Sequence, residues 1–314
     1  MQTPSQTAPR ITRRESLRAL TALGTAALLG RLRAADLQPN PLLTRRIPSS
    51  GEELPVIGLG SWITFNVGDD AEARGECAEV MRRFFGLGGR LIDSSPMYGS
   101  SQAVIGHGLA KLDRAKDVFS AEKVWTSGRQ GRAQIEETRR RWGVPGFDLL
   151  QVHNLEDWEA HLPLLFEMKA AKKLRYVGVT TSHGRRTAET EQLMRTQPLD
   201  FVQVTYNAAD RDLEQRLLPL AQDRGIAVII NRPFREGALI RAVARHKLPS
   251  WAAEFDCTNW AQFLLKFIVS HPAVTCAIPA TSNPDHVIEN MGAAYGRLPD
   301  AAMRRQMADH VRAL

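Results

Sequence analysis

The chain of 314 residues is long enough for one large domain or two ordinary ones, and its composition, 43% hydrophobic and 24% charged, is that of a globular protein. The formal net charge of +7 is concentrated at the N-terminus, where residues 1–35 hold six arginines and one glutamate. The other 279 residues carry only +2, which leaves no basic surface of the kind that binds nucleic acid.

The basic N-terminal segment is expected to be a targeting signal. Paired arginines in TRRESLR (12–18) precede an uncharged run, residues 19–30, which is too short for a stable membrane span of about 20 residues but fits a signal peptide. The segment resembles a twin-arginine export signal, although Ser16 stands where Phe is usual. We therefore expect residues 1–35 to send the protein to the periplasm through the twin-arginine translocation machinery. The alternative is a basic tail on a cytoplasmic enzyme.

Eight short apolar segments, rich in β-branched residues and bounded by polar turns, are typical of strands. They are residues 56–62, 90–95, 118–125, 148–154, 175–181, 201–207, 226–232 and 274–280. Helical patterns lie between them, for example over residues 71–88 and 211–225. Eight strand–helix units within about 230 residues predict an α/β fold, a closed (β/α)8 TIM barrel, because closure leaves no sheet edge exposed.

The barrel is expected to form one domain over residues 36–314, with residues 36–55 across its bottom and terminal helices from Pro284 onward. The main alternative is a doubly wound nucleotide-binding sheet, which should show GxGxxG after its first strand. The segments GLGSW and GLGGRL both lack the third glycine. Three cysteines without CxxC spacing indicate neither a disulfide framework nor a zinc site.

Four residues capable of acid–base chemistry fall at the ends of predicted strands, which meet at one face of a barrel. Asp93 ends the second strand and Tyr98 follows it, Lys123 lies in the third, and His153 ends the fourth. A buried lysine needs a partner such as Asp93. Its charge is expected to lower the pKa of Tyr98, and His153 can bind a carbonyl oxygen. Such a site protonates an oxygen while a hydride attacks the carbon; the alternative is a structural ion pair beside an ordinary polar histidine.

These four residues, with a glycine directly after the tyrosine, resemble the catalytic tetrad of the aldo-keto reductase superfamily, which is carried on an eight-stranded barrel. The segments GLGSW, YVGVTT, QVTYN and IPATSNPDHVIEN also resemble segments of that family, and the resemblance covers about residues 50–295. It implies that Tyr98 is the general acid, that Lys123 and Asp93 tune it, and that His153 orients the substrate carbonyl.

The resemblance also implies a nicotinamide dinucleotide extended across the barrel mouth, with NADP(H) expected over NAD(H). Trp62 is expected to line the substrate side, although a rim aromatic that closes the barrel is an equal alternative. The residues implied to bind the cofactor are Gly60, Ser61, Thr180, Thr181, Gln203, Asn231, Pro233, Phe234, Gly237, Leu239, Pro279, Ser282, His286, Glu289 and Asn290.

Four positions depart from the family pattern. Asn231 replaces a tyrosine found in some members, and Gln102 replaces a common glutamate. Ala280 and His286 stand where Lys and Arg often bind the 2′-phosphate of NADP, and a neutral histidine binds phosphate more weakly than a guanidinium group.

The sequence thus predicts an NAD(P)H-dependent reductase that converts an aldehyde or ketone to an alcohol. A second possibility is a dinucleotide-binding redox sensor or regulatory barrel with little turnover. A third, a metal-dependent isomerase or hydrolase, needs three or four ligands at strand ends, whereas only Asp93 and His153 are present and Lys123 between them opposes a cation.

Overall fold

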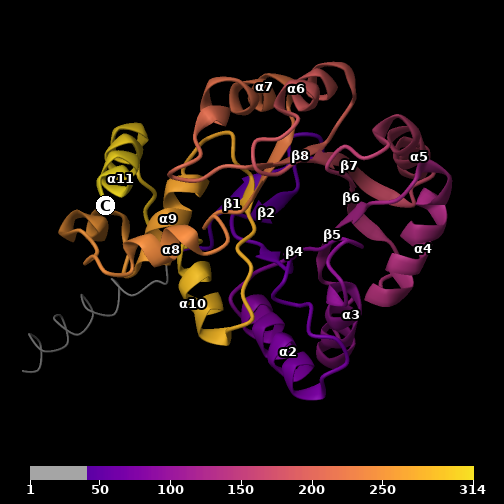
Figure 1. Ribbon diagram of the computed structural model, residues 1–314, viewed down its shortest axis with the longest axis horizontal. Helices are drawn as coiled ribbons and strands as arrows, with labels where there is room; N and C mark the ends of the chain where they lie inside the picture. The colour runs from indigo at the N-terminus through magenta and orange to yellow at the C-terminus, as the bar shows by residue number, and fades with distance from the viewer. Residues whose placement is uncertain (1–40) are drawn as a thin grey trace, which may run out of the picture. The chain divides into compact units, whose positions relative to one another are not determined.

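Eight parallel strands form one sheet that closes into a barrel in the computed structural model, which describes residues 41–314 (Figure 1). Each strand pairs with the next in chain order, and each overlaps one of the apolar segments singled out above. The strands are β3 (Leu59–Gly60), β4 (Leu91–Asp93), β5 (Phe119–Val124), β6 (Phe147–His153), β7 (Leu174–Thr180), β8 (Phe201–Thr205), β9 (Ala227–Asn231) and β10 (Cys276–Ala277). The predicted (β/α)8 fold, a single domain, is confirmed.

The barrel closes between its first and last strands, β3 and β10. Parallel bridges join Ile57 to Ala277 and Gly60 to Ala280, and the Gly60 N–H donates to the Pro279 carbonyl at 3.0 Å. A Cβ atom at Gly60 would lie 2.8 Å from the Ile278 carbonyl oxygen. Glycine is required here because any side chain would push the two strands apart at the seam.

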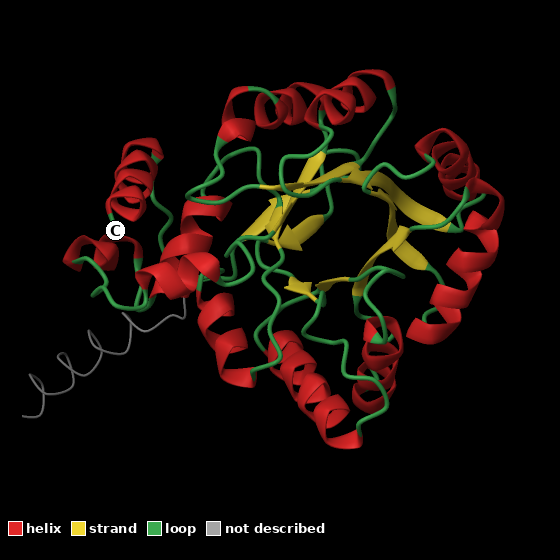
Figure 2. Cartoon of the chain, viewed as in Figure 1, coloured by secondary structure: helices red, strands yellow, loops and turns green. Residues whose placement is uncertain are grey.

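Helices surround the strands on the outside, as Figure 2 shows. They are α2 (Ala71–Gly86), α3 (Ser101–Leu112), α4 (Gly131–Trp142), α5 (Trp158–Ala170), α6 (Thr187–Thr196), α7 (Leu217–Arg224), α8 (Ala238–Val243), α9 (Trp260–Val269), α10 (Pro284–Gly292) and α11 (Ala301–Ala313), with 3₁₀ turns η1 (Gly128–Gln130), η2 (Asp212–Gln215) and η3 (Ser250–Phe255). In α2, Asp70 caps the first turn by accepting from Ala73 N at 2.9 Å, and a buried stripe that includes Val80 and Phe84 faces the core.

The helical pattern over residues 211–225 does not form one helix. The structure divides it into η2 and α7, with a break at Arg216, whose φ is −135° and ψ −65°. Pro219 explains the break, because a proline ring clashes with the carbonyl four residues earlier, here that of Gln215, and cannot donate a hydrogen bond to it.

A hairpin of β1 (Thr44–Arg46) and β2 (Glu53–Pro55) covers the end of the barrel where the strands begin. Its buried side chains Ile47 and Leu54 belong to the inner core, which also contains Phe119, the first residue of β5. The expected cover over the barrel bottom is therefore present, and the opposite end stays available for the site. The chain from Pro284 onward forms α10 and α11, as predicted.

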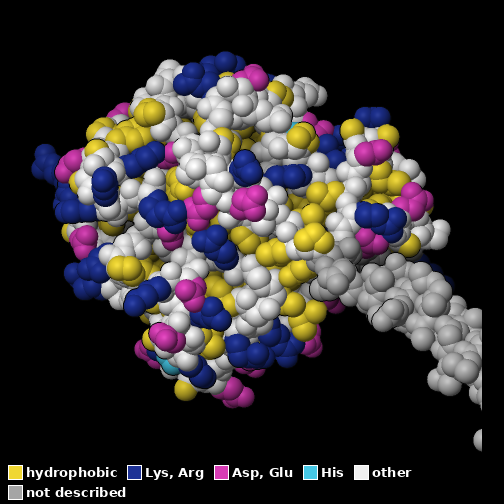
Figure 3. Space-filling view, turned by 180° about the vertical axis from the view of Figure 1, so that it is seen from behind, with side chains coloured by type: hydrophobic (Ala, Val, Ile, Leu, Met, Phe, Trp, Pro, Cys, Tyr) yellow, Lys and Arg dark blue, Asp and Glu magenta, His cyan; other side chains and the backbone are white. Residues whose placement is uncertain are grey.

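The surface is mixed in charge. On the face drawn in Figure 3, lysine and arginine side chains alternate with aspartate and glutamate, and the arginines of α4 pair with acids of the same helix, for example Arg139 with Glu136. Within residues 41–314, no helix combines the length and apolar character needed to cross a membrane. The twin-arginine-like segment and the boundary at residue 35 lie outside the described residues.

Candidate active site

The carboxyl ends of β4, β5 and β6 bring Asp93, Lys123 and His153 to one face of the barrel, together with Tyr98 from the loop after β4. Lys123 Nζ donates to Asp93 Oδ2 at 2.6 Å and to the Ser94 carbonyl at 2.7 Å. Both side chains are buried. Burial alone would lower the pKa of Lys123, but the nearby Asp93 and Tyr98 reverse the effect and raise the pKa, so the ammonium stays charged.

Tyr98 lies between Lys123 and His153. Lys123 Nζ is 5.1 Å from the centroid of the tyrosine ring, and the His153 ring meets it edge-on at 5.7 Å between centroids. Gly99, with φ +62°, turns the chain directly after Tyr98, and a Cβ there would lie 2.2 Å from Asn66 Oδ1. Asn66 in turn accepts from the N–H of Ser100 at 2.9 Å, so the loop that carries Tyr98 is held against the loop after β3.

The pKa of Tyr98 is raised, which corrects the expectation that Lys123 lowers it. Burial of the phenol is the larger effect, and the Lys123 charge offsets only part of it. The position of Lys123 beside Tyr98 is predictable from the sequence, but the depth at which the phenol is buried is not. A tyrosine with a raised pKa is protonated throughout the neutral range and can therefore donate a proton.

His153 is neutral, because burial and the charge of Lys123 lower its pKa to about 3. Its Nδ1 lies 2.7 Å from Ser95 Oγ, which already accepts the Met97 N–H at 3.2 Å. The hydroxyl proton of Ser95 can therefore be donated to Nδ1, and in that arrangement the proton of the imidazole is on Nε2. Sequence reasoning assigned Ser95 no role; the signal was a serine two residues after a strand-ending aspartate.

A cavity of about 390 Å³ opens beside these residues and is lined by Asp93, Tyr98 and His153. Trp62 also lines it. Eight of the residues implied to bind the cofactor lie on its wall: Gly60, Ser61, Thr180, Gln203, Asn231, Pro233, Phe234 and Gly237.

Gln203 and Asn231 are held firmly on that wall. Gln203 Nε2 donates to Asp93 Oδ1 at 2.7 Å, and its Oε1 accepts from Thr180 Oγ1 at 3.2 Å. Asn231 Nδ2 donates to the Thr181 carbonyl at 2.9 Å and its Oδ1 accepts from Thr205 Oγ1 at 2.6 Å. These bonds tie the ends of β7, β8 and β9 together around the cavity.

Seven residues of the same set do not line this cavity. Thr181 is buried and its carbonyl accepts from Asn231, Leu239 lies in α8, and the Pro279 carbonyl accepts from the Gly60 N–H of β3 at the barrel seam. The other four gather at α10: Ser282, His286, Glu289 and Asn290. Ser282, His286 and Glu289 are exposed and Asn290 is buried. Any contact of these four residues with a cofactor would therefore lie outside the cavity.

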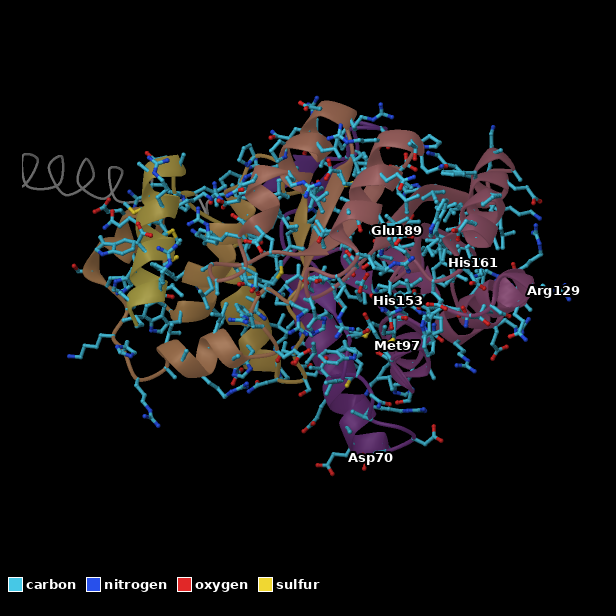
Figure 4. The ribbon with its side chains drawn as sticks, turned by 45° about the horizontal axis from the view of Figure 1, so that its top comes forward. Asp70, Met97, Arg129, His153, His161 and Glu189 are labelled. Carbon is cyan, nitrogen blue, oxygen red and sulfur yellow. The ribbon has the colours of Figure 1, made fainter. Side chains whose placement is uncertain are left out.

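One side of the cavity is apolar and includes a strained residue that sequence reasoning missed. Thr64 N donates to the Trp62 carbonyl at 2.7 Å, closing a three-residue γ-turn around Ile63, whose φ is +65°. A β-branched residue avoids this conformation. Ile63 is nevertheless 62% exposed and lines the cavity with Met97, which lies near His153 in Figure 4. Backbone strain cannot be read from residue identity.

The loops after β7 and β9 meet at the cavity on its other side. His183 Nε2 lies 3.9 Å from Glu236 Oε1, and Arg232 forms an ion pair with the same carboxylate. All three residues line the cavity. Among residues 41–314, no group of three His, Cys, Asp or Glu side chains is placed to hold a metal ion.

Comparisons with known proteins agree with this geometry. The profile of the "Aldo/keto reductase family" matches residues 56–308. Methylglyoxal reductase YeaE of Escherichia coli is 28% identical over 82% of this chain and 92% of its own length. The NADH-specific methylglyoxal reductase of the same bacterium is 23% identical over 84% of this chain and 98% of its own.

Solved structures give the same result. An aldo-keto reductase from Klebsiella pneumoniae in complex with NADPH is 25% identical, with a TM-score of 0.68 over 86% of this chain and 95% of its own. With the barrel, the site geometry and a profile match over most of its length, the chain belongs to the aldo/keto reductase family of enzymes.

Proposed function

We propose that the protein reduces an aldehyde or ketone to an alcohol with a nicotinamide dinucleotide as hydride donor. The observation that carries this proposal is the buried Lys123–Asp93 pair beside a protonated Tyr98 and a neutral His153. A proton donor and a hydrogen-bond donor thus line one cavity, and a cation lies beside the proton donor. A carbonyl oxygen that becomes negatively charged needs the same three groups.

In the proposed reaction each residue has a separate task. Bound nicotinamide supplies a hydride to the carbonyl carbon. His153 donates from Nε2 to the carbonyl oxygen and holds it near the phenol. Tyr98 transfers its proton to that oxygen, and Lys123, kept charged by Asp93, stabilises the tyrosinate that remains.

The cavity wall fits a nicotinamide group. Thr180, Gln203 and Asn231 present hydroxyl and amide groups without a charge, which is the donor set that an uncharged carboxamide requires. Trp62 and Ile63 form the apolar side of the cavity, which we assign to the substrate.

NADP(H) is proposed as the cofactor over NAD(H). A relative with bound NADPH supports this choice, whereas an NADH-specific relative and the replacement of Lys and Arg by Ala280 and His286 weaken it. Titration of the full-length protein with NADPH and with NADH, followed by tryptophan fluorescence, tests whether a nicotinamide dinucleotide binds and which of the two binds more tightly. Saturable quenching with tighter binding of NADPH is expected. Tighter binding of NADH would overturn the preference, and binding of neither by the folded protein would overturn the hydride mechanism.

We also propose, from the sequence of residues 1–35, that the protein is exported to the periplasm by the twin-arginine machinery. The paired Arg13 and Arg14 before an uncharged run support this proposal. Residues 1–35 fused to a reporter should reach the periplasm, and Arg13→Lys/Arg14→Lys should stop export. A reporter that stays in the cytoplasm with the natural segment would identify a basic tail on a cytoplasmic enzyme.

A further inference from the structure

Behind the catalytic lysine, on the outer side of the same strand, lies a carboxylate that the proposed reaction does not use. Side chains alternate along β5, so Lys123 points into the barrel while Glu122 points out toward α3 and α4. Glu122 is fully buried. Its Oε2 accepts from Gln102 Nε2 at 3.0 Å and from Trp142 Nε1 at 2.9 Å.

The other oxygen of Glu122 holds the backbone of the lysine. The ladder between β4 and β5 ends at the pair Asp93–Ala121, because β4 then turns into the loop that carries Tyr98. Beyond this pair, the Lys123 N–H donates to Glu122 Oε1 at 2.8 Å. The carboxylate thus satisfies a backbone donor at the point where the neighbouring strand no longer runs alongside.

Every partner of Glu122 donates a hydrogen bond, which suits the ionised carboxylate. None of them is a cation. The charged or titratable groups nearest to it are Lys123 on its own strand, Asp93 at the end of β4, and Tyr98 in the following loop. On the helix side, α3 presents the uncharged Gln102. Arg141 of α4 pairs with Glu137 at 3.0 Å and donates to the Gln102 Oε1 at 3.5 Å, but not to Glu122.

Burial without a bonded cation makes this carboxylate costly. Burial raises the pKa of Glu122 to about 7, although the charge of Lys123 and the hydrogen bonds from the Lys123 N–H and from Gln102 act in the opposite direction. An apolar residue would fill the same space at lower cost. The position of the group, one peptide from Lys123, points to a role in the site.

We propose, on the basis of the reductase function above, that Glu122 is a positioning residue that fixes the backbone of Lys123 from outside the barrel and places a negative charge directly behind the Lys123–Asp93 pair. It touches neither substrate nor cofactor and acts through Lys123 and Tyr98. Gln102 completes the arrangement, since a second carboxylate at that position would repel the first.

Glu122→Gln tests the charge, because the amide keeps the shape and can still accept the Lys123 N–H. The tyrosinate absorbance of Tyr98, obtained by subtracting the titration of Tyr98→Phe, should appear at lower pH in Glu122→Gln than in the wild type. The alkaline fall in kcat/KM for carbonyl reduction should move in the same direction. The absorbance needs no turnover, so it tests Glu122 even if the reductase function is wrong.

The exchange variant Gln102→Glu/Glu122→Gln distinguishes the effect of Glu122 on the titration of Tyr98 from its effect on the stability of the fold. It keeps one buried carboxylate bonded to one amide, but moves the charge to α3, away from the Lys123 N–H. We expect it to unfold at higher urea concentration than Glu122→Gln and still to ionise Tyr98 earlier than the wild type. The proposal is overturned if the exchange variant ionises Tyr98 at the same pH as the wild type. It is also overturned if neither Glu122→Gln nor the exchange variant changes the pH at which Tyr98 ionises. Glu136→Gln, an exposed change on α4, is the control and should titrate as the wild type does.

Discussion

Lys123 keeps a full charge inside the barrel because Asp93 Oδ2 lies 2.6 Å from its Nζ. Removal of either side chain would leave the other buried without a partner of opposite charge. Lys123→Met should lower the free energy of unfolding by about 3–5 kcal/mol, since a buried carboxylate is left without its cation. The double variant Asp93→Asn/Lys123→Met should recover part of this loss, although both variants should lack reductase activity. Urea unfolding measures the difference; equal destabilisation by the single and double variants would show that the pair is not coupled.

Ile63 combines an unfavourable backbone with an exposed side chain at the cavity. Ile63→Gly should therefore stabilise the fold, because relief of strain worth about 1–3 kcal/mol exceeds the entropy cost of glycine, roughly 0.5–1 kcal/mol. The same change should raise KM for apolar carbonyl substrates through loss of contact. Ile63→Val, which keeps the branch and the strain, should resemble the wild type. A less stable glycine variant would show that the turn is not strained.

At the scale of elements, the barrel seam depends on a glycine. Gly60→Ala places a methyl group 2.8 Å from the Ile278 carbonyl and should cost about 1–3 kcal/mol of stability. Gly75→Ala in α2 is the matched control: nothing lies within 4 Å of its added methyl group, and the helix should gain about 0.5–1 kcal/mol. Opposite shifts in the urea midpoint are expected, and a stabilised Gly60→Ala would contradict the close approach at the seam.

The elements were predictable where a local pattern determines them. Short apolar segments between polar turns identified all eight strands, and the strand ends brought Asp93, Lys123 and His153 to one face. The break between η2 and α7 was not anticipated, although Pro219 marks it in the sequence. The pKa direction of Tyr98 and the role of Ser95 depend on burial and on contacts between loops, which no local pattern contains.

For the whole molecule, histidines that the fold shields from water should make stability fall in acid. Burial, with Arg304 as a smaller cause, lowers the pKa of His271 to about 4, below the 6.5 of an exposed histidine. The unfolded chain therefore takes up a proton first, and the stability due to this group is lost as pH falls from about 6.5 toward 4. His153, with a pKa of about 3, acts in the same direction over a wider range.

His271→Asn tests this dependence away from the site, because the amide oxygen can still accept the Ala273 N–H that Nδ1 accepts at 3.2 Å. The free energy of unfolding of the variant should decline less steeply between pH 6.5 and pH 4, by at most about 1.4 kcal/mol per pH unit. Parallel curves for the two proteins would show that His271 titrates normally. Glu122, with a pKa of about 7, opposes the trend, since it favours the folded state as pH falls from about 7 to 4.5.

Proton transfer from Tyr98 is the central claim, and one measurement tests it directly: oxidation of NADPH at 340 nm with an aromatic aldehyde, by wild type and Tyr98→Phe. NADPH binding, followed by tryptophan fluorescence, should be the same for both proteins, whereas kcat should fall roughly 10²–10⁴-fold in the variant, the contribution typical of a general acid. Equal turnover by the variant would contradict the mechanism. Binding of NADPH without turnover by the wild type would instead indicate a regulatory barrel that senses the dinucleotide.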